Sequence, residues 1–285
     1  MRFRFGGVEF GGSDTLWMTG FDPGSADLRT DDSVNPNRDG ALPGRDLLGG
    51  KMWRLDMTTR QPDLSSALAL SAALEAEWKD EKVRLNPLVK VPLSYRMDGR
   101  WRRVYGRPDR YQGFAETLIT KQGVGRVTAD FRVMDPLTYD DEPSTVTLTI
   151  VPASTGGLIA PLAAPLSTAR SSAPRAGLVV NTGDAPTPLG VTFFGPVVDP
   201  WVRAAAGWEV ALTGSLAYDQ SVTLDPMAGT VTRQDGAPAA GMLTRRTRLS
   251  GTRLSRGTNE LTFGGTDSTG TARAVLSWRN AYYSL

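Results

Sequence analysis

The 285-residue sequence contains no cysteine and no histidine. The absence of cysteine excludes disulfides, thiol catalysis and thiolate metal sites, and the absence of histidine removes the commonest general base and the commonest metal ligand. Lysine is scarce too, because only five of the 32 basic residues are lysines and the other 27 are arginines. Most familiar types of active site are therefore excluded before any motif is considered.

The sequence also lacks a strong net charge and long apolar runs. Basic residues exceed acidic ones by only two, so no overall field indicates a nucleic-acid or membrane partner. No segment approaches the ~20 consecutive apolar residues of a membrane-spanning helix. The N-terminal stretch MRFRFGGVEFGG has no continuous apolar core, so we expect no signal peptide.

Turn-forming residues are abundant, and their distribution predicts a mainly β protein with two domains. The 31 glycines and 19 prolines separate many short runs of β-branched and aromatic residues. We expect an N-terminal antiparallel β-sandwich with one α-helix over residues 1–152 and a linker rich in Ala, Ser, Thr and Pro over 153–176. A second β-sandwich, expected over 177–285, is long enough to fold without the rest of the chain.

One helix and one long loop stand out in the first domain. Asp63 is a favourable N-cap for a helix over 63–79. The residues expected on its core-facing side are Leu64, Ala67, Leu68, Ser71, Leu74, Glu75 and Trp78. Between residues 22 and 50 the composition is polar and rich in turn formers, so we expect a long loop without regular structure that a neighbouring molecule orders.

Part of that loop, residues 35–46, has the spacing of a calcium-binding loop. Oxygen-bearing side chains stand at its first, third, fifth and twelfth positions, with a glycine at the sixth. However, Asn35 replaces the usual aspartate, Asp46 is shorter than the usual glutamate, and neither flank is predicted to be helical. We therefore expect neither a metal nor a cofactor here.

Arginine and aromatic residues are concentrated between residues 96 and 111. The members are Arg96, Arg100, Arg102, Arg103, Arg107 and Arg110, interleaved with Trp101, Tyr105 and Tyr111. This composition fits the solvated face of a hairpin, a protein interface, or a surface that stacks on a nucleic-acid strand. The small net charge favours the first two interpretations over the third.

Two tryptophans of the second domain, Trp201 and Trp208, are candidate contacts for a glycan. The competing interpretation is that they fill the core or an interface, as most aromatic residues do. Acidic pairs such as Asp31 and Asp32 are neighbours in turns rather than groups placed across a cleft, so they do not indicate acid–base catalysis. We therefore expect no enzymatic activity.

Short motifs occur in a fixed order along the chain. The first half has RFRFGGVEF at 2–10, RDG at 38–40 and FRVMDP at 131–136. The second half has NTGD at 181–184, FGP at 194–196, LDP at 224–226, GTNELTF at 257–263 and WRNAY at 278–282. In this order the motifs resemble the distal tail protein family (Dit) of bacteriophages with long non-contractile tails, whose members are also labelled minor tail proteins.

The resemblance implies a structural virion protein made in the host cytoplasm, with no catalytic residues. Its N-terminal domain would form a homohexameric ring between the tail tube and the tail-tip hub, and its C-terminal domain would be a galectin-like β-sandwich. The suspected interface residues are Arg38, Asp39, Arg45, Arg96, Arg100, Trp101, Arg102, Arg103, Arg107 and Arg110. The alternative function is a carbohydrate-binding module that recognises a host-surface glycan through the C-terminal sandwich.

Overall fold

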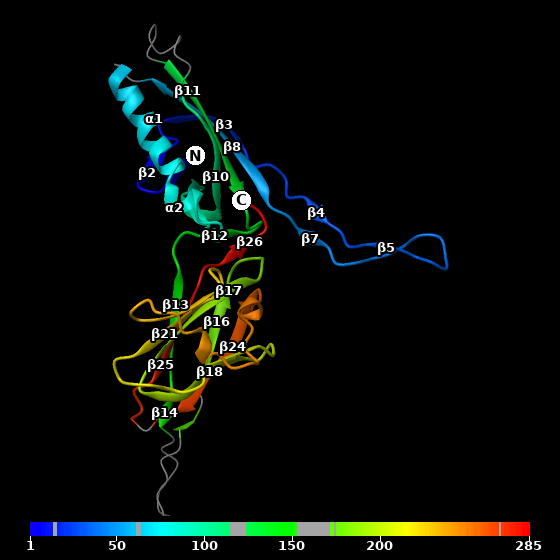
Figure 1. Ribbon diagram of the computed structural model, residues 1–285, viewed down its shortest axis with the longest axis vertical. Coiled ribbons are helices and arrows are strands. Elements are labelled where there is room, and N and C mark those ends of the chain that lie inside the picture. Colours follow the sequence, from blue (N-terminus) through cyan, green and yellow to red (C-terminus); the bar gives the residue numbers. More distant parts are fainter. Residues whose placement is uncertain (14–15, 61–63, 115–123, 153–171, 174, 268) are drawn as a thin grey trace, which may run out of the picture. The chain divides into compact units, whose positions relative to one another are not determined.

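The chain divides into two compact units in the computed structural model, which describes residues 1–13, 16–60, 64–114, 124–152, 172–173, 175–267 and 269–285 (Figure 1). Unit 1 comprises Met1–Glu142 and Tyr283–Leu285, and unit 2 comprises Pro143–Tyr282. Both units are built from antiparallel sheets, and unit 1 carries one long helix. The predicted fold class is therefore confirmed.

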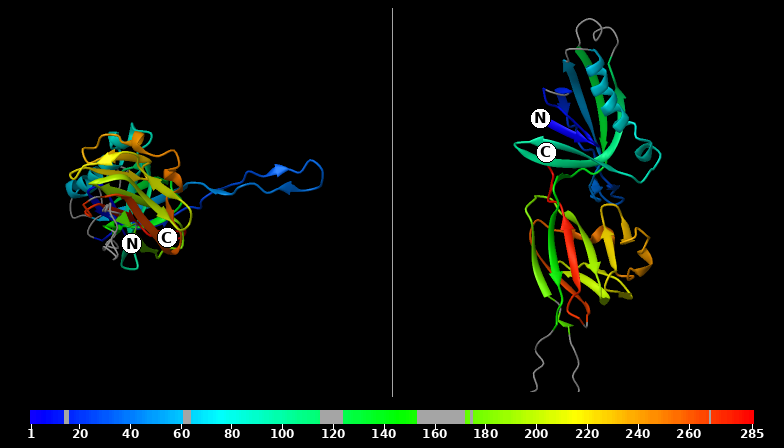
Figure 2. Two further views of the ribbon diagram at one scale, coloured as in Figure 1. Left: turned by 90° about the horizontal axis from the view of Figure 1, so that it is seen from below. Right: turned by 90° about the vertical axis from the view of Figure 1, so that its left-hand side faces the viewer.

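Unit 1 is built on one continuous antiparallel sheet with the strand order β2-β1-β9-β10-β11-β8-β3, to which β12 adds by pairing with β10. The strands are β1 (Arg2–Phe5), β2 (Val8–Phe10), β3 (Trp17–Asp22), β8 (Lys51–Arg60), β9 (Val91–Met97), β10 (Arg100–Gln112), β11 (Val124–Val133) and β12 (Thr138–Asp140). The sheet curves around its own core (Figure 2), since Phe21 of the last strand packs on Phe3 of β1 with ring centroids 5.4 Å apart. One sheet thus supplies both layers of the sandwich.

The core of unit 1 is closed by α1 (Leu64–Trp78), which confirms the predicted helix. Trp78 packs on Phe5, with ring centroids 4.8 Å apart. The buried side chains of α1 are Ala67, Ser71, Leu74 and Trp78. Leu68, predicted on the same face, is instead 47% exposed, and the predicted cap Asp63 lies outside the described residues.

A short helix that the sequence analysis did not predict, α2 (Glu81–Arg84), follows α1. The Asp80 carboxylate caps it by accepting a hydrogen bond from the Lys82 backbone N–H at 2.9 Å. Of these two described helices, neither has the length and apolar character needed to cross a membrane.

The segment expected to be an irregular loop, 22–50, is instead a two-stranded ribbon, which we call the arm (residues 23–50; Figure 1). Its strands pair as β4 (Leu28–Arg29) with β7 (Leu47–Leu48) and β5 (Ser33–Val34) with β6 (Ala41–Leu42). The expectation was wrong because the arm connects β3 to β8, which are antiparallel neighbours in the sheet. The outgoing and returning halves of the connection therefore start side by side and in opposite directions, which favours pairing between them.

Unit 2 is a sandwich of two antiparallel sheets. One has the order β13-β25-β17-β21-β22 with β23 on β17, and the other has the order β16-β24-β18-β19 with β20 on β18. The strands are β13 (Ser144–Thr149), β16 (Arg175–Asn181), β17 (Thr187–Phe194), β18 (Val197–Ala204), β19 (Glu209–Ala211), β20 (Ser215–Leu216), β21 (Ser221–Asp225), β22 (Thr230–Arg233), β23 (Arg253–Leu254), β24 (Gly257–Thr266) and β25 (Arg273–Trp278). Smaller elements are β14 (Val151–Pro152), β15 (Ser172–Ala173), β26 (Ala281–Tyr282) and the 3-10 turns η1 (Ala240–Met242) and η2 (Leu249–Gly251).

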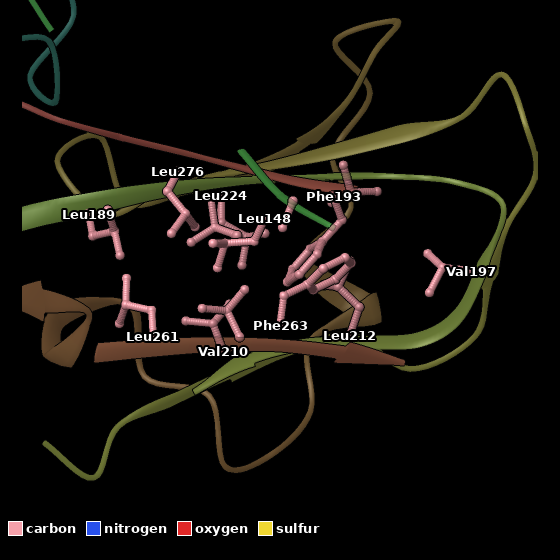
Figure 3. Close-up of a cluster of buried hydrophobic side chains, with 14 of the residues drawn as sticks. Leu148, Leu189, Phe193, Val197, Val210, Leu212, Leu224, Leu261, Phe263 and Leu276 are labelled. Atoms are coloured by element: carbon pink, nitrogen blue, oxygen red, sulfur yellow. The ribbon is translucent and has the colours of Figure 1, made fainter. Parts of the chain in front are cut away.

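The two sheets of unit 2 bury an apolar layer between them (Figure 3). Phe193 of β17 and Phe263 of β24 meet across this layer, with ring centroids 6.0 Å apart. Burial alternates strictly along β17, as expected for a strand with one face in a core.

Strand β13 changes the boundary between the two domains. From the sequence, residues 143–152 are expected to belong to the first domain. Instead, β13 pairs with β25 from Ser144↔Trp278 to Thr149↔Arg273, and Leu148 is buried in the unit 2 core. Contacts therefore separate the units at Glu142–Pro143 rather than at residue 152. Most of the predicted linker, 153–176, lies outside the described residues.

One buried carboxylate organises the turn that precedes β25. Asp267 Oδ1 accepts hydrogen bonds from the Thr269 backbone N–H and hydroxyl, both at 2.7 Å, and Oδ2 accepts one from the Ala272 N–H at 2.8 Å. Burial alone would raise the pKa of Asp267, but these hydrogen bonds, with one from Gly270, outweigh it and lower the pKa below its ordinary value.

We expect Asp267→Ala to destabilise the protein at neutral pH by about 1–3 kcal/mol, because it leaves the N–H of buried Ala272, and that of Thr269, without an acceptor. Since the folded-state pKa is lowered, this stabilisation is fully present above the unfolded-state pKa of about 4 and is lost as the pH falls through the folded-state value. Melting temperatures of wild type and variant should therefore converge in strong acid. Asp219→Ala, at an exposed turn acid, is the control; a difference that stays constant with pH would contradict the assignment.

Candidate interaction surfaces

The arm exposes apolar side chains along its whole length. These residues are Leu28, Val34, Leu42, Leu47 and Leu48, with exposures between 45% and 85%. A two-stranded ribbon by itself is at most marginally stable in water, and several exposed apolar residues on one short segment are typical of a binding surface. The arm therefore has the properties of a segment that another molecule covers.

Three predicted interface residues lie on the arm. Arg38 and Asp39 stand in the tip turn, which is closed by a hydrogen bond from the Asn35 N–H to the Gly40 carbonyl at 3.2 Å, and Arg45 lies between β6 and β7. All three are exposed. Residues 35–46, which have the spacing of a calcium-binding loop, form the tip of the ribbon. In the described part of the chain, no group of acidic residues is arranged to hold a metal ion.

The arginine-rich stretch forms the β9–β10 hairpin, with Asp98 and Gly99 at its turn as the sequence indicates. Both turn residues have positive φ, 50° and 79°, which is the conformation a two-residue hairpin turn requires. Trp101 is half-buried, with the Arg4 guanidinium 4.5 Å from its ring centroid. The hairpin is therefore partly engaged within unit 1 itself.

Two of the six hairpin arginines, Arg103 and Arg107, make several internal contacts each. Arg103 forms an ion pair with Asp141 at 2.8 Å, in which both side chains are mostly buried. Arg107 donates to the carbonyls of Arg84 at 3.1 Å and Asn86 at 3.0 Å, and also to that of Val83. Both residues therefore stabilise the fold of unit 1.

The other four arginines of the hairpin lie nearer the surface. Arg96 donates to the Gly99 carbonyl at 3.3 Å, and Arg110 donates to the Gln112 side chain at 3.0 Å. Arg100 is exposed and Arg102 is half-buried. Of the hairpin arginines, Arg96, Arg100 and Arg110 are thus the most available to a partner.

We expect Arg107→Ala to lower the free energy of unfolding by about 1–3 kcal/mol, because three backbone carbonyls near the end of α2 lose a charged donor. Chemical denaturation measures the change. Arg110→Ala removes an exposed arginine of the same strand that donates to the Gln112 side chain, so it should change stability by less than about 0.5 kcal/mol. Equal effects of the two variants would contradict a structural role for Arg107.

In unit 2 the two candidate tryptophans have different surroundings. Trp201 lies on the outer face of β18 against Gly264 of β24, where a Cβ atom would come within 2.3 Å of the indole ring. Trp208 lies between β18 and β19, packs partly on the core, and donates its Nε1–H to the Arg253 carbonyl at 2.8 Å. Trp208 also lines a hollow in the surface.

That hollow has a volume of about 490 Å³. Its lining residues are Arg203, Gly207, Trp208, Glu209, Arg246, Arg248 and Gly251. Arg246 and Arg248 were not among the residues predicted from the sequence, although they belong to a basic run at 245–248. Their position beside Trp208 depends on contacts between distant segments.

The architecture, a curved β unit with one long helix followed by a β-sandwich, is that of bacteriophage tail-tip proteins. The chain is similar to SPP1 Dit, described as a paradigm of the hub adsorption apparatus in phages that infect Gram-positive bacteria, with a TM-score of 0.62, 12% identity and 97% of both chains covered. It is also similar to a chain of the phage p2 baseplate in its activated conformation with strontium, with a TM-score of 0.56, 10% identity, and 98% of this chain and 97% of that chain covered. No protein-family model and no curated protein matches the sequence.

The similarity extends over both units, so the chain has the fold of the phage distal tail proteins. This result confirms the resemblance that the order of the sequence motifs indicated. At identities of 10–12% the similarity establishes the fold and leaves function to be argued from the surfaces.

Proposed function

We propose that this chain is a structural, non-enzymatic virion protein: a distal tail ring subunit that links the phage tail tube to the tail-tip hub. The observation that carries the proposal is the match to SPP1 Dit over 97% of both chains. The similarity to a baseplate chain supports the same role, since both matched proteins come from the adsorption end of a phage tail.

In the proposed assembly, unit 1 forms a homohexameric ring. The arm supports this assignment because it offers a neighbouring subunit exposed apolar side chains together with Arg38, Asp39 and Arg45. A head-to-tail contact repeated about an axis closes into a ring. Exposed Arg96 and Arg100 on the β9–β10 hairpin provide charged contacts of the kind that anchor protein interfaces.

We expect native mass spectrometry at raised concentration, or imaging of intact tails, to show six copies in a closed ring. The Arg96→Glu, Arg100→Glu double variant should weaken the ring without unfolding the subunit, because neither side chain is buried. Arg103 is left intact, since its ion pair with Asp141 belongs to the fold. Arg233→Glu, at an exposed position in unit 2, is the matched control. A monomer or another symmetry in the assembled tail would overturn the ring.

A second candidate function is glycan recognition by unit 2. It is favoured by one observation, the hollow beside Trp208. Trp201 supports it less, because its ring is packed against Gly264. A glycan site on unit 2 is compatible with a ring formed by unit 1.

A further inference from the structure

The hollow beside Trp208 carries an excess of positive charge. Arg203 and Glu209 neutralise each other through hydrogen bonds from Arg203 Nε at 2.9 Å and Nη2 at 2.5 Å to Glu209 Oε2. Among the residues that the structure describes, no acidic side chain forms an ion pair with Arg246 or Arg248. Two guanidinium groups are therefore left to attract an anion.

The segment that carries these two arginines is held in place. Thr247, which lies between them, accepts a hydrogen bond from the Ala211 N–H at 2.9 Å and donates one to the Ala211 carbonyl at 3.2 Å. The Thr244 N–H also donates to the Ala211 carbonyl, at 3.1 Å. Because Ala211 ends β19, these contacts fix Arg246 and Arg248 next to Glu209 and Trp208.

Trp208 supplies a rigid wall to the hollow. Its Nε1–H is occupied by the Arg253 carbonyl, and part of the ring packs on the unit 2 core. The ring is therefore held in one orientation before any ligand arrives. Gly207 and Gly251 line the same hollow without side chains that would fill it.

We propose that this hollow binds an anionic saccharide, a sugar that carries a phosphate or carboxylate group. Arg246 and Arg248 bind the anionic group through charge-assisted hydrogen bonds. The Trp208 ring packs against the apolar face of the sugar, and Glu209 accepts hydrogen bonds from its hydroxyl groups. The inference deepens the second candidate function above and does not depend on the ring.

The geometry favours a saccharide over an acidic peptide. An extended peptide binds most readily by adding to an open strand edge. Here the edge of β19 is already covered by residues 243–247, through the Ala211 contacts and a bridge between Leu212 and Leu243. A hollow of about 490 Å³ is also of the size that holds a small ligand.

The test uses the full chain and small probes of defined chemistry. Titrations followed by NMR of the Trp208 indole N–H compare glucose 1-phosphate, glucuronate, D-glucose and inorganic phosphate. We expect at least one of the two anionic sugars to bind about tenfold or more tightly than D-glucose and inorganic phosphate, because only they engage both the arginines and the ring. Which of the two binds tighter identifies the anionic group.

Variants then assign the contacts. The Arg246→Gln, Arg248→Gln double variant should weaken binding of the preferred sugar about tenfold or more, and Trp208→Ala should weaken it as well. Trp208→Phe keeps a ring in place in case the alanine variant is unfolded. Arg245→Gln is the matched control, because this exposed arginine of the same run does not line the hollow.

Three results would overturn the proposal: no binding of either anionic sugar, unchanged affinity in the double arginine variant, or an equal loss with Arg245→Gln. Tighter binding of a hexaglutamate peptide that depends on Arg246 and Arg248 would assign the surface to an acidic protein instead. Native mass spectrometry of the same variants separates the two functions, because we expect their rings to be unchanged.

Discussion

Replacing residues 28–48 with an Asn-Gly turn is expected to abolish ring assembly while the subunit stays folded. The Gly49 N–H donates to the Asp27 carbonyl at 2.7 Å, so a two-residue turn bridges the cut at a point where the chain ends already meet. Within the described part of the chain, the removed strands pair only with one another. The free energy of unfolding should therefore change by less than about 0.5 kcal/mol.

Loss of assembly follows because the deletion removes all five exposed apolar side chains that we assign to the neighbouring subunit. Chemical denaturation measures folding, and native mass spectrometry or imaging of assembled tails measures the ring. A finer variant, Val34→Asp with Leu42→Asp, keeps the length of the arm and charges two exposed apolar positions, and Ser33→Asp is its control. A complete ring from the shortened subunit would show that the arm has another partner.

Features that depend on residues close together in the sequence were predictable from it. The spacing of apolar residues predicts the α1 helix, and the turn formers at Asp98 and Gly99 predict the β9–β10 hairpin. The error at Leu68 has a different cause, because burial there depends on packing between the helix and the sheet. Helical periodicity identifies a broad face, but the width of the buried stripe depends on how closely the sheet approaches, which the spacing does not encode.

Pairings between distant segments were not predictable in the same way. Composition indicated that residues 22–50 are polar, but the ribbon forms because β3 and β8 lie side by side. The same limit applies to the hairpin arginines, where a list of charges does not reveal the partners. Arg103 forms an ion pair with Asp141, and Arg107 donates hydrogen bonds to carbonyls near α2. Fewer hairpin arginines are therefore available to another molecule than their number in the sequence indicates.

The hollow in unit 2 shows the limit most clearly. Trp208 was a candidate from its residue type alone, whereas Arg246 and Arg248 were overlooked in a basic run with no aromatic neighbour. They line the same hollow as Trp208, and Thr247 between them is hydrogen-bonded to Ala211 at the end of β19. A binding site assembled from segments of different strands and turns becomes visible once the sheet register is known.

A fragment of residues 143–282 is expected to melt cooperatively, and a fragment of 177–282 is expected to be unfolded or nearly so. The shorter fragment lacks β13, which leaves one edge of β25 unpaired and removes Leu148 and Ile150 from the core. Full burial of each such side chain contributes about 1.5–3 kcal/mol. Their combined loss approaches the ~5–15 kcal/mol total stability of a typical domain. The earlier expectation that residues 177–285 fold alone is revised accordingly.

Calorimetry and amide NMR dispersion distinguish the two fragments, and point variants separate burial from strand pairing. In the longer fragment, Leu148→Ala with Ile150→Ala should lower the melting temperature strongly, because both side chains are buried. Thr147→Ala with Thr149→Ala changes the exposed face of the same strand and should have a small effect. If both fragments melt at the same temperature, β13 is dispensable and the second domain begins after it. If only the longer fragment folds, unit 2 begins at Pro143 and β13 is part of it.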